Sequence, residues 1–163
     1  MRRVRQLYNA VFAKLDPHDL AYIHNLLDKP AQEGFFRMAV CDQSHCLDTA
    51  YSVLSAASSL GLTDSILRHL QQAALLHDVG KSVGSVGVVA RVVYVLVETW
   101  SSLQIFRYFG LDLQLRILAE HPKNGAQILS SIGVDPVVVK WVRDHHQPKD
   151  RYSRLLAVAD SRN

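Results

Sequence analysis

The histidine and aspartate residues of this sequence are spaced so that several of them could bind a cation together. The chain carries eight histidines in 163 residues, and Asp78 directly follows His77. An imidazole and a carboxylate about 100° apart on one helical turn can converge on one cation. His77 also continues an apolar stripe at helical spacing that begins at Ile66, so we expect its imidazole to face the core. A core histidine satisfied by hydrogen bonds is the alternative interpretation of one such residue.

The same inward direction recurs near the C-terminus. His145 ends an apolar stripe that begins at Val138, and Asp160 follows Leu156 by one helical turn. Burying an unpaired carboxylate costs several kcal/mol, so an inward-facing Asp78 and Asp160 need a cation. Basic side chains do not lie on these stripes, and a metal ion is therefore the predicted partner.

Two further histidines extend the set. His45 shares a helical face with Val53, and His121 precedes Pro122 at a predicted helix boundary, where a side chain can reach into a cleft. Imidazoles combined with carboxylates favour Fe, Mn, Ni, Co or Zn over Ca or Mg, which prefer oxygen ligands. The set contains no cysteine, which distinguishes it from a structural zinc site.

Helix signals along the whole chain predict the elements that position these side chains. A capping Asp precedes a Pro at Asp16 and again at Asp135, and Gly61 suits the left-handed residue after a helix. The predicted helices begin at or near Asp16, Pro30, Asp42, Thr63, Asp135 and Asp150. We therefore expect an all-α fold in a single domain of residues 1–163, with 1–29 as a helical extension packed on a metal-binding core of 30–163.

The segment from Val83 to Val97 departs from this pattern because it is rich in β-branched valine. Strict alternation is absent and no partner strand is evident, so we predict a buried helix rather than a strand. A membrane-spanning helix needs about 20 apolar residues, and this shorter stretch is interrupted by Arg91. An amphipathic segment at a membrane surface is the alternative.

Composition narrows the class of protein. The chain is 48% hydrophobic with a net charge of +3, which excludes a disordered chain and gives too little positive charge to indicate a nucleic-acid groove. Its two cysteines, Cys41 and Cys46, do not make a disulfide framework and indicate a reducing cytoplasm. No oligomeric state follows from the sequence.

The order of the candidate ligands resembles that of the HD-domain superfamily of metal-dependent phosphohydrolases. The stretch from His77 to Lys81 is similar to the superfamily's HD-[IV]-G-K signature. Residues 42–45 and 120–125 resemble the corresponding pieces of small stand-alone bacterial members, and the resemblance covers roughly residues 30–163. It rests on the ordered series His45, His77-Asp78, His121, His145-His146 and Asp160.

The resemblance implies a buried centre of one or two divalent metal ions that cleaves a phosphate ester through a metal-activated hydroxide. It assigns a primary metal site to His45, His77, Asp78 and Asp160. It also assigns a second ion, bridged by Asp78, to His121, His145 and His146. Lys81 would either contact a substrate phosphate or cap the end of its helix.

The sequence also departs from one branch of the superfamily. The Gly-Tyr-Pro motif of cyclic-di-GMP phosphodiesterases is missing after His146, which argues against that substrate. Basic residues crowd this end of the chain, at Arg143, Lys149 and Arg151. They would either hold a phosphate group or form a solvated basic face.

Three functions remain open at this point. The first is hydrolysis of a phosphate ester of a nucleotide or another small phosphorylated metabolite. The second is oxygen activation at a di-iron centre, since a branch of the superfamily uses this ligand set in that way. The third is a non-catalytic scaffold or ligand-binding domain, although such relatives typically lose ligands that are present here.

Overall fold

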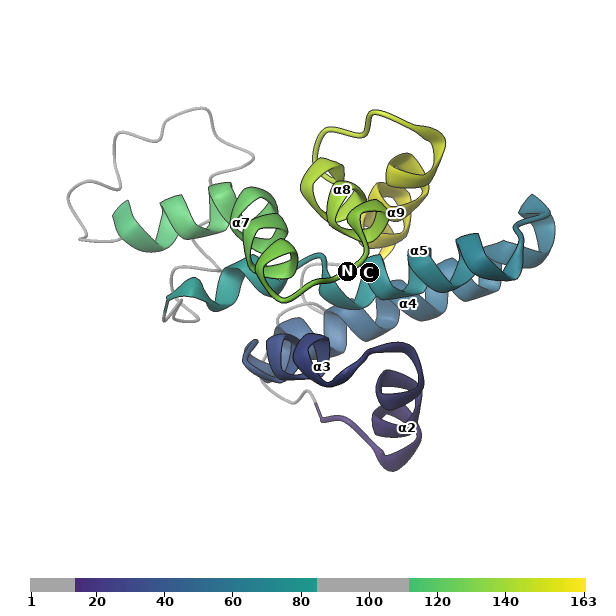
Figure 1. Cartoon of the computed structure of the whole chain (residues 1–163), viewed down its shortest axis with the longest axis horizontal. Coiled ribbons are helices and arrows are strands. Elements are labelled where there is room, and N and C mark those ends of the chain that lie inside the picture. Colours follow the sequence, from purple (N-terminus) through teal and green to yellow (C-terminus); the bar gives the residue numbers. More distant parts are fainter. Residues whose placement is uncertain (1–13, 85–111) are drawn as a thin grey trace.

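The computed structural model describes residues 14–84 and 112–163, and every regular element in these two ranges is a helix (Figure 1). In chain order the elements are α2 (Pro17–Leu26), α3 (Lys29–Phe36), α4 (Val40–Leu60), α5 (Asp64–Leu76), the 3-10 helix η1 (Val79–Val83), α7 (Asp112–Ser131), α8 (Pro136–Asp144) and α9 (Arg151–Arg162). The predicted all-α fold is confirmed for this part of the chain.

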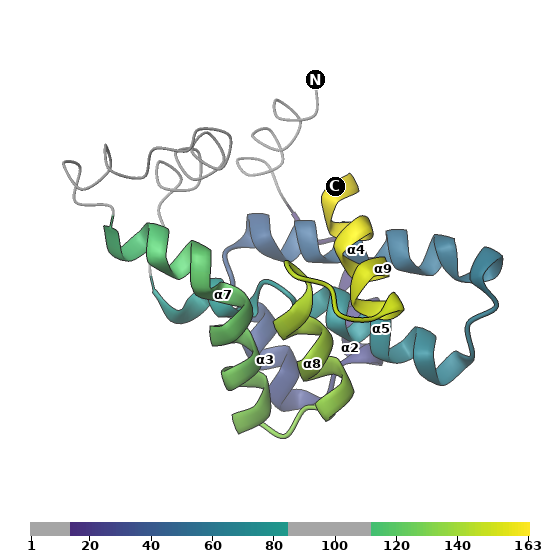
Figure 2. The same ribbon diagram turned by 90° about the horizontal axis from the view of Figure 1, so that it is seen from above.

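Helix α5 is the element around which the others pack. It runs beside α4, and it also contacts α2, α3, α8 and α9. Seen from above, α8 and α9 lie over α5, and α7 lies beside α8 (Figure 2). Helix α7 also packs on η1, which directly continues from the C-terminal end of α5. The candidate ligands carried by α4, α7, α8 and α9 are thereby brought to that end of α5.

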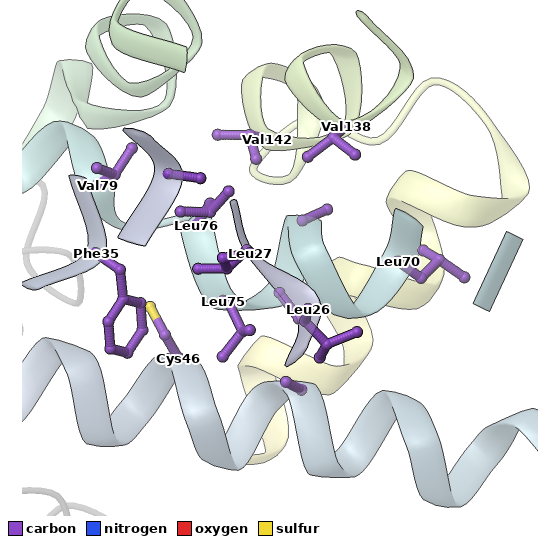
Figure 3. Packing of buried hydrophobic residues seen from close by; sticks show 14 of the residues in the cluster. Leu26, Leu27, Phe35, Cys46, Leu70, Leu75, Leu76, Val79, Val138 and Val142 are labelled. Carbon is purple, nitrogen blue, oxygen red and sulfur yellow. The ribbon is translucent and has the colours of Figure 1, made fainter. Parts of the chain in front are cut away.

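Apolar side chains from these helices fix the position of α5. Leu70 and Leu75 on α5 pack with Leu26 from α2, Phe35 from α3 and Val138 from α8, all of them buried (Figure 3). Apolar surface removed from water in this way contributes roughly 25 cal/mol per Å². The core thus holds the C-terminal end of α5 in place from several sides.

Most predicted helix starts are confirmed. Asp16 forms a capping box with Asp19 at the start of α2, and Asp135 accepts a hydrogen bond from the backbone N–H of Val137 at the start of α8. At other starts Thr63 caps α5 and Asp150 caps α9. Gly61 takes the left-handed conformation after α4, with φ of 57°.

Two predicted boundaries are wrong. Helix α4 begins at Val40 with Ala39 as its N-cap, so Asp42 lies inside the first turn and is not the N-cap. A carboxylate at that position interacts favourably with the positive end of the helix dipole. Pro122 lies in the interior of α7, so no helix boundary exists at His121. The predicted start near Pro30 is confirmed: helix α3 begins at Lys29, one residue earlier, with Asp28 as its N-cap.

Two predicted regions fall wholly or partly outside the described residues. Of the valine-rich segment, only Val83 and Gly84 are described; Val83 ends η1 with 58% of its surface exposed. Of the expected N-terminal extension, residues 1–13 are not described, whereas α2 packs on α5 through the buried Ile23 and Leu26. Within the described ranges, no helix combines the length and apolar character needed to cross a membrane.

A glycine contact brings α7 against η1. A Cβ atom added to Gly80 would overlap the backbone oxygen of His121 and would lie 2.6 Å from the backbone nitrogen of Gly125. Only a residue without a side chain permits this approach of two backbones. The contact places His121, on α7, next to Asp78, which precedes η1.

Candidate metal centre

The His77-Asp78 pair lies where α5 ends and η1 begins. His77 is the C-cap of α5, and Asp78 follows it with φ of −96° and ψ of 1°, outside regular helix. Both side chains are almost fully buried. The change in backbone direction turns the two side chains toward the same space, in which other candidate ligands also lie.

Seven candidate ligands meet in this space. Their ring nitrogens and carboxylate oxygens form three groups in which all the atoms lie within 4.8 Å of one another. The groups are His45 with His77 and Asp78, His77 with His145 and Asp160, and His121 with His145 and His146. These seven residues are the ones that the sequence singled out, and the structure brings all of them together.

Asp78 lies between two of these groups. Its Oδ1 atom is 3.2 Å from Nε2 of His121 and 3.6 Å from Nε2 of His77. Its Oδ2 atom accepts a hydrogen bond of 2.6 Å from Nζ of Lys81. One carboxylate oxygen thus faces the histidines while the other binds the lysine.

Asp160 lies on the other side of His77. Its Oδ1 atom accepts a hydrogen bond of 2.8 Å from Nε2 of His45 and lies 3.7 Å from Nε2 of His77. Helix α9, which carries Asp160, packs on both α4 and α5, and these helices carry His45 and His77. Helix α9 therefore places Asp160 against His45, on the side of the cluster where α4 lies.

Backbone hydrogen bonds orient three of the imidazoles in the same way. The Nδ1 atoms of His77, His121 and His145 lie 2.8, 2.6 and 2.6 Å from the carbonyl oxygens of Ala74, Leu118 and Val142. A carbonyl oxygen can only accept, so each Nδ1 carries a hydrogen and donates it. The Nε2 atoms are left as the ones that face the cluster.

The Nε2 atoms have an arrangement that suits a bound cation. Those of His121 and His145 lie 3.3 Å apart, and with hydrogens on both Nδ1 atoms two lone pairs face each other. Nε2 of His77 is buried without a hydrogen-bond partner in the described structure, although two carboxylates are near it. A cation that accepts nitrogen and oxygen donors resolves both features, so the residues fit a transition-metal centre.

Comparison with protein families agrees with this geometry. A model of the HD domain matches residues 43–162, which is well over half of the chain. The chain belongs to the HD-domain family. Searches of curated proteins and of solved structures found no match. The HD superfamily consists mostly of metal-dependent hydrolases, and the His and Asp groups of this HD domain could hold a metal ion.

The carboxylates of the HD centre are ionised. Burial raises the pKa of Asp78, but the charges of Lys81 and His77 and the nearby imidazole of His121 lower it more, to well below the usual range. Burial likewise raises the pKa of Asp160, whereas the hydrogen bond from His45 and the nearby His77 hold it far below the usual range. The centre therefore presents two negative charges to a cation.

The imidazoles of the centre differ in their protonation. Burial, and then the neighbouring His77 and His146, lower the pKa of His145 well below its ordinary value, so His145 is neutral. Burial also lowers the pKa of His77, but Cys46, Asp78 and Asp160 raise it further than burial lowers it. The surroundings thus favour a positive charge at Nε2 of His77. Either a proton or a metal ion can supply that charge.

Lys81 corrects one expectation from the sequence. Basic side chains were expected to be absent from the cluster, yet Lys81 binds Asp78 through the 2.6 Å hydrogen bond and is only 18% exposed. Burial lowers the pKa of Lys81, but Asp78 and Asp42 raise it above its ordinary value, so the lysine is charged. The sequence pattern missed this contact because η1 is a 3-10 helix, in which residues three apart lie on one side.

The basic residues near the C-terminus make local contacts. Arg143 binds the buried Asp144 through Nε at 2.9 Å, and Lys149 lies 3.5 Å from the same carboxylate. Arg151 lies over the ring of Tyr152. Asp144 was missed by the sequence analysis, although it directly precedes His145. Because Arg143 and Lys149 are both near the Asp144 carboxylate, the structure favours a solvated basic face over a phosphate-binding role for them.

Cys46 is a further neighbour of the HD centre. Its Sγ atom lies 3.6 Å from Nδ1 of His77, and the side chain is fully buried beside Phe35 (Figure 3). Burial raises the pKa of the thiol, so it stays protonated. Cys46 is thus a small buried residue of the core, whereas Cys41 is partly exposed.

Proposed function

We propose that this HD domain is a metal-dependent phosphohydrolase that cleaves a phosphate ester of a nucleotide or another small phosphorylated metabolite. The observation that carries the proposal is the convergence of imidazole Nε2 atoms on Oδ1 of Asp78. Such an arrangement is expensive for a structural core, because lone pairs and charges are buried there without full hydrogen bonding.

The ligand groups suggest two adjoining ions. His45, His77, Asp78 and Asp160 would hold the first, and His121, His145 and His146 would hold the second, with Asp78 shared between them. When bound, such ions lower the pKa of a water molecule and stabilise negative charge on phosphoryl oxygens. The metal is Fe, Mn, Ni, Co or Zn by the chemistry of the donors.

The chain's own residues contribute orientation and charge. The hydrogen bonds to Ala74, Leu118 and Val142 keep three imidazoles turned toward the centre. Lys81 keeps Asp78 ionised, and its ammonium group has three N–H donors, of which Asp78 uses one. We propose that a remaining donor binds a non-bridging oxygen of the substrate phosphate.

His146 lies at the edge of the centre. It is exposed, whereas His121 and His145 are buried, and its ring centroid lies 4.7 Å from that of His121. Partial burial of the imidazole and the neighbouring His121 lower its pKa, so it is neutral and can bind a metal. The substrate would therefore approach from the side of His146.

The test combines metal content with turnover. Protein purified without chelators is assayed by mass spectrometry for metals, then on a panel of nucleotides and sugar phosphates with each candidate metal. We expect one to two ions per chain, and phosphate release that Asp78→Asn abolishes. The matched control is Asp64→Asn, which changes an exposed carboxylate in the first turn of α5, the helix that precedes Asp78, and which should retain activity.

Two other outcomes would replace the proposal. Iron at about two ions per chain, with oxygen consumption and no phosphate release, would establish the di-iron oxygenase instead. No metal in the purified protein and none taken up afterwards would establish a scaffold or ligand-binding domain.

A further inference from the structure

Two of the carbonyls that orient the imidazoles, those of Ala74 and Val142, lie in the last turn of a helix. His77 and His145 are the C-cap residues of α5 and α8, and each donates to a carbonyl three residues earlier, in the last turn. Carbonyls in the last turn of a helix have no intrahelical N–H partner. In these two cases the end of the helix supplies a free acceptor for Nδ1.

His121 makes the same hydrogen bond without a helix end. It lies in the interior of α7, which continues to Ser131, and its Nδ1 donates to Leu118 at 2.6 Å. Inside an α-helix, that carbonyl accepts from the backbone N–H four residues later. The residue four positions after Leu118 is Pro122, which has no backbone N–H. The carbonyl oxygen of Leu118 therefore lacks its usual backbone donor, although it lies in the middle of the helix.

We propose that Pro122 is a positioning residue for His121. By withholding the backbone donor, it leaves the carbonyl of Leu118 to Nδ1 of His121 and so directs Nε2 toward Asp78 and His145. Proline is the least favourable residue for a helix interior, and Pro122 lies well past the first turn of α7, where proline is tolerated. The inference rests on the metal centre of the proposed function but not on its reaction.

The decisive variant is Pro122→Ala, which restores an N–H that competes for Leu118. Histidine side-chain ¹⁵N NMR on chelator-treated protein reads the tautomer of His121 directly, with His121→Asn identifying its signals. We expect the Nδ1–H tautomer to dominate in the native protein and the Nε2–H tautomer to appear in the variant. Affinity for Mn²⁺ or Zn²⁺, measured by calorimetry, should fall about 10- to 100-fold, the usual cost of losing an orienting hydrogen bond.

Stability separates positioning from packing. Alanine is a far better helix former than proline, so the melting temperature of metal-free Pro122→Ala should stay equal or rise while metal affinity falls. A merely structural role for Pro122 predicts that both fall together. Pro136→Ala is the matched control, because Pro136 lies in the first turn of α8, where an N–H has no intrahelical partner. It should change neither the tautomer nor the affinity.

A backbone ester at position 122 completes the test. Lactic acid introduced there has the side chain of alanine but no N–H, and we expect it to restore the native tautomer and metal affinity. The proposal is overturned if Pro122→Ala keeps the native tautomer and affinity, or if the ester loses them as fully as alanine does. If the native protein binds no metal, the proposed function fails, whereas the tautomer still decides the role of Pro122.

Discussion

The Nε2 atoms of His121 and His145 lie 3.3 Å apart, although each imidazole donates its Nδ1 hydrogen to a backbone carbonyl at 2.6 Å. Neither Nε2 therefore has a hydrogen to give the other while the rings are neutral. The carbonyls of Leu118 on α7 and Val142 on α8 orient the two rings so that the Nε2 lone pairs face each other. A cation between the two Nε2 atoms would relieve this opposition, which is why the buried centre fits a metal ion.

Replacing His121 by asparagine should remove one metal ion. The Asn amide N–H₂ lies near the position of Nδ1 and can keep the hydrogen bond to Leu118, while Nε2 is lost. We expect metal stoichiometry to fall from two ions per chain to one. The free energy of unfolding of the metal-free protein should change by no more than about 1 kcal/mol, because one hydrogen bond is retained. An unchanged stoichiometry would exclude His121 as a ligand.

Gly80→Ala should separate α7 from η1. The new Cβ would overlap the backbone oxygen of His121, and backbone on both sides has no flexible end that can move away. We expect a loss of about 1–3 kcal/mol in stability, typical of overpacking, together with loss of metal binding. Gly34→Ala is the control, because its Cβ would lie 3.5 Å from Val79, an ordinary contact. Denaturation curves and calorimetry measure both effects.

Lys81→Gln should weaken the binding of phosphate more than that of metal. The glutamine amide can still donate to Asp78, but its positive charge is gone. We expect inhibition by inorganic phosphate to weaken about 10-fold, since a hydrogen bond to a charged group contributes roughly 1.5–3 kcal/mol. Metal content should stay the same. Unchanged phosphate inhibition with a lower melting temperature would mean that Lys81 only stabilises Asp78.

The cap of α9 should make stability depend on pH. Burial raises the pKa of Asp150, but Lys140 and the N–H and hydroxyl of Ser153 lower it more, to below its usual range. Because the folded-state pKa lies below the unfolded value of about 3.9, the stabilisation is present above that value and is lost as pH falls. Asp150→Ala should cost about 1 kcal/mol at pH 7.

The difference between native protein and Asp150→Ala should shrink when urea denaturation is repeated at pH 3. Lys140→Ala removes only the 2.6 Å ion pair, which is partly exposed, and should cost less than loss of the cap. A cost for Asp150→Ala that does not depend on pH would contradict a role for the carboxylate charge.

Local sequence signals were sufficient for most of the helix starts. Asp16 and Asp135 cap helices as predicted, and the helix start predicted at Asp150 is also capped by that residue. These signals are local, because a capping side chain accepts from first-turn N–H groups within three residues. The helix start predicted at Asp42 was wrong. The helix begins at Val40, and burial of Asp42 near Lys81 depends on contacts that lie far away in the sequence.

The sequence by itself determined which side chains face inward. Apolar stripes on single helices carry His77, His145 and Asp160 to the core side, because the direction of a side chain on a helix follows from its spacing. The sequence also indicated the chemistry of the donors, since imidazole and carboxylate are fixed by residue type.

Only the tertiary structure decided which atoms meet. The close approach of Gly80 to α7 sets His121 beside Asp78, and the packing of α9 on α4 sets Asp160 beside His45. Which ring nitrogen faces the centre depends on carbonyls left free at helix ends or by Pro122. These relationships join residues far apart in the chain, and no local pattern encodes a distance that arises from packing several helices around α5.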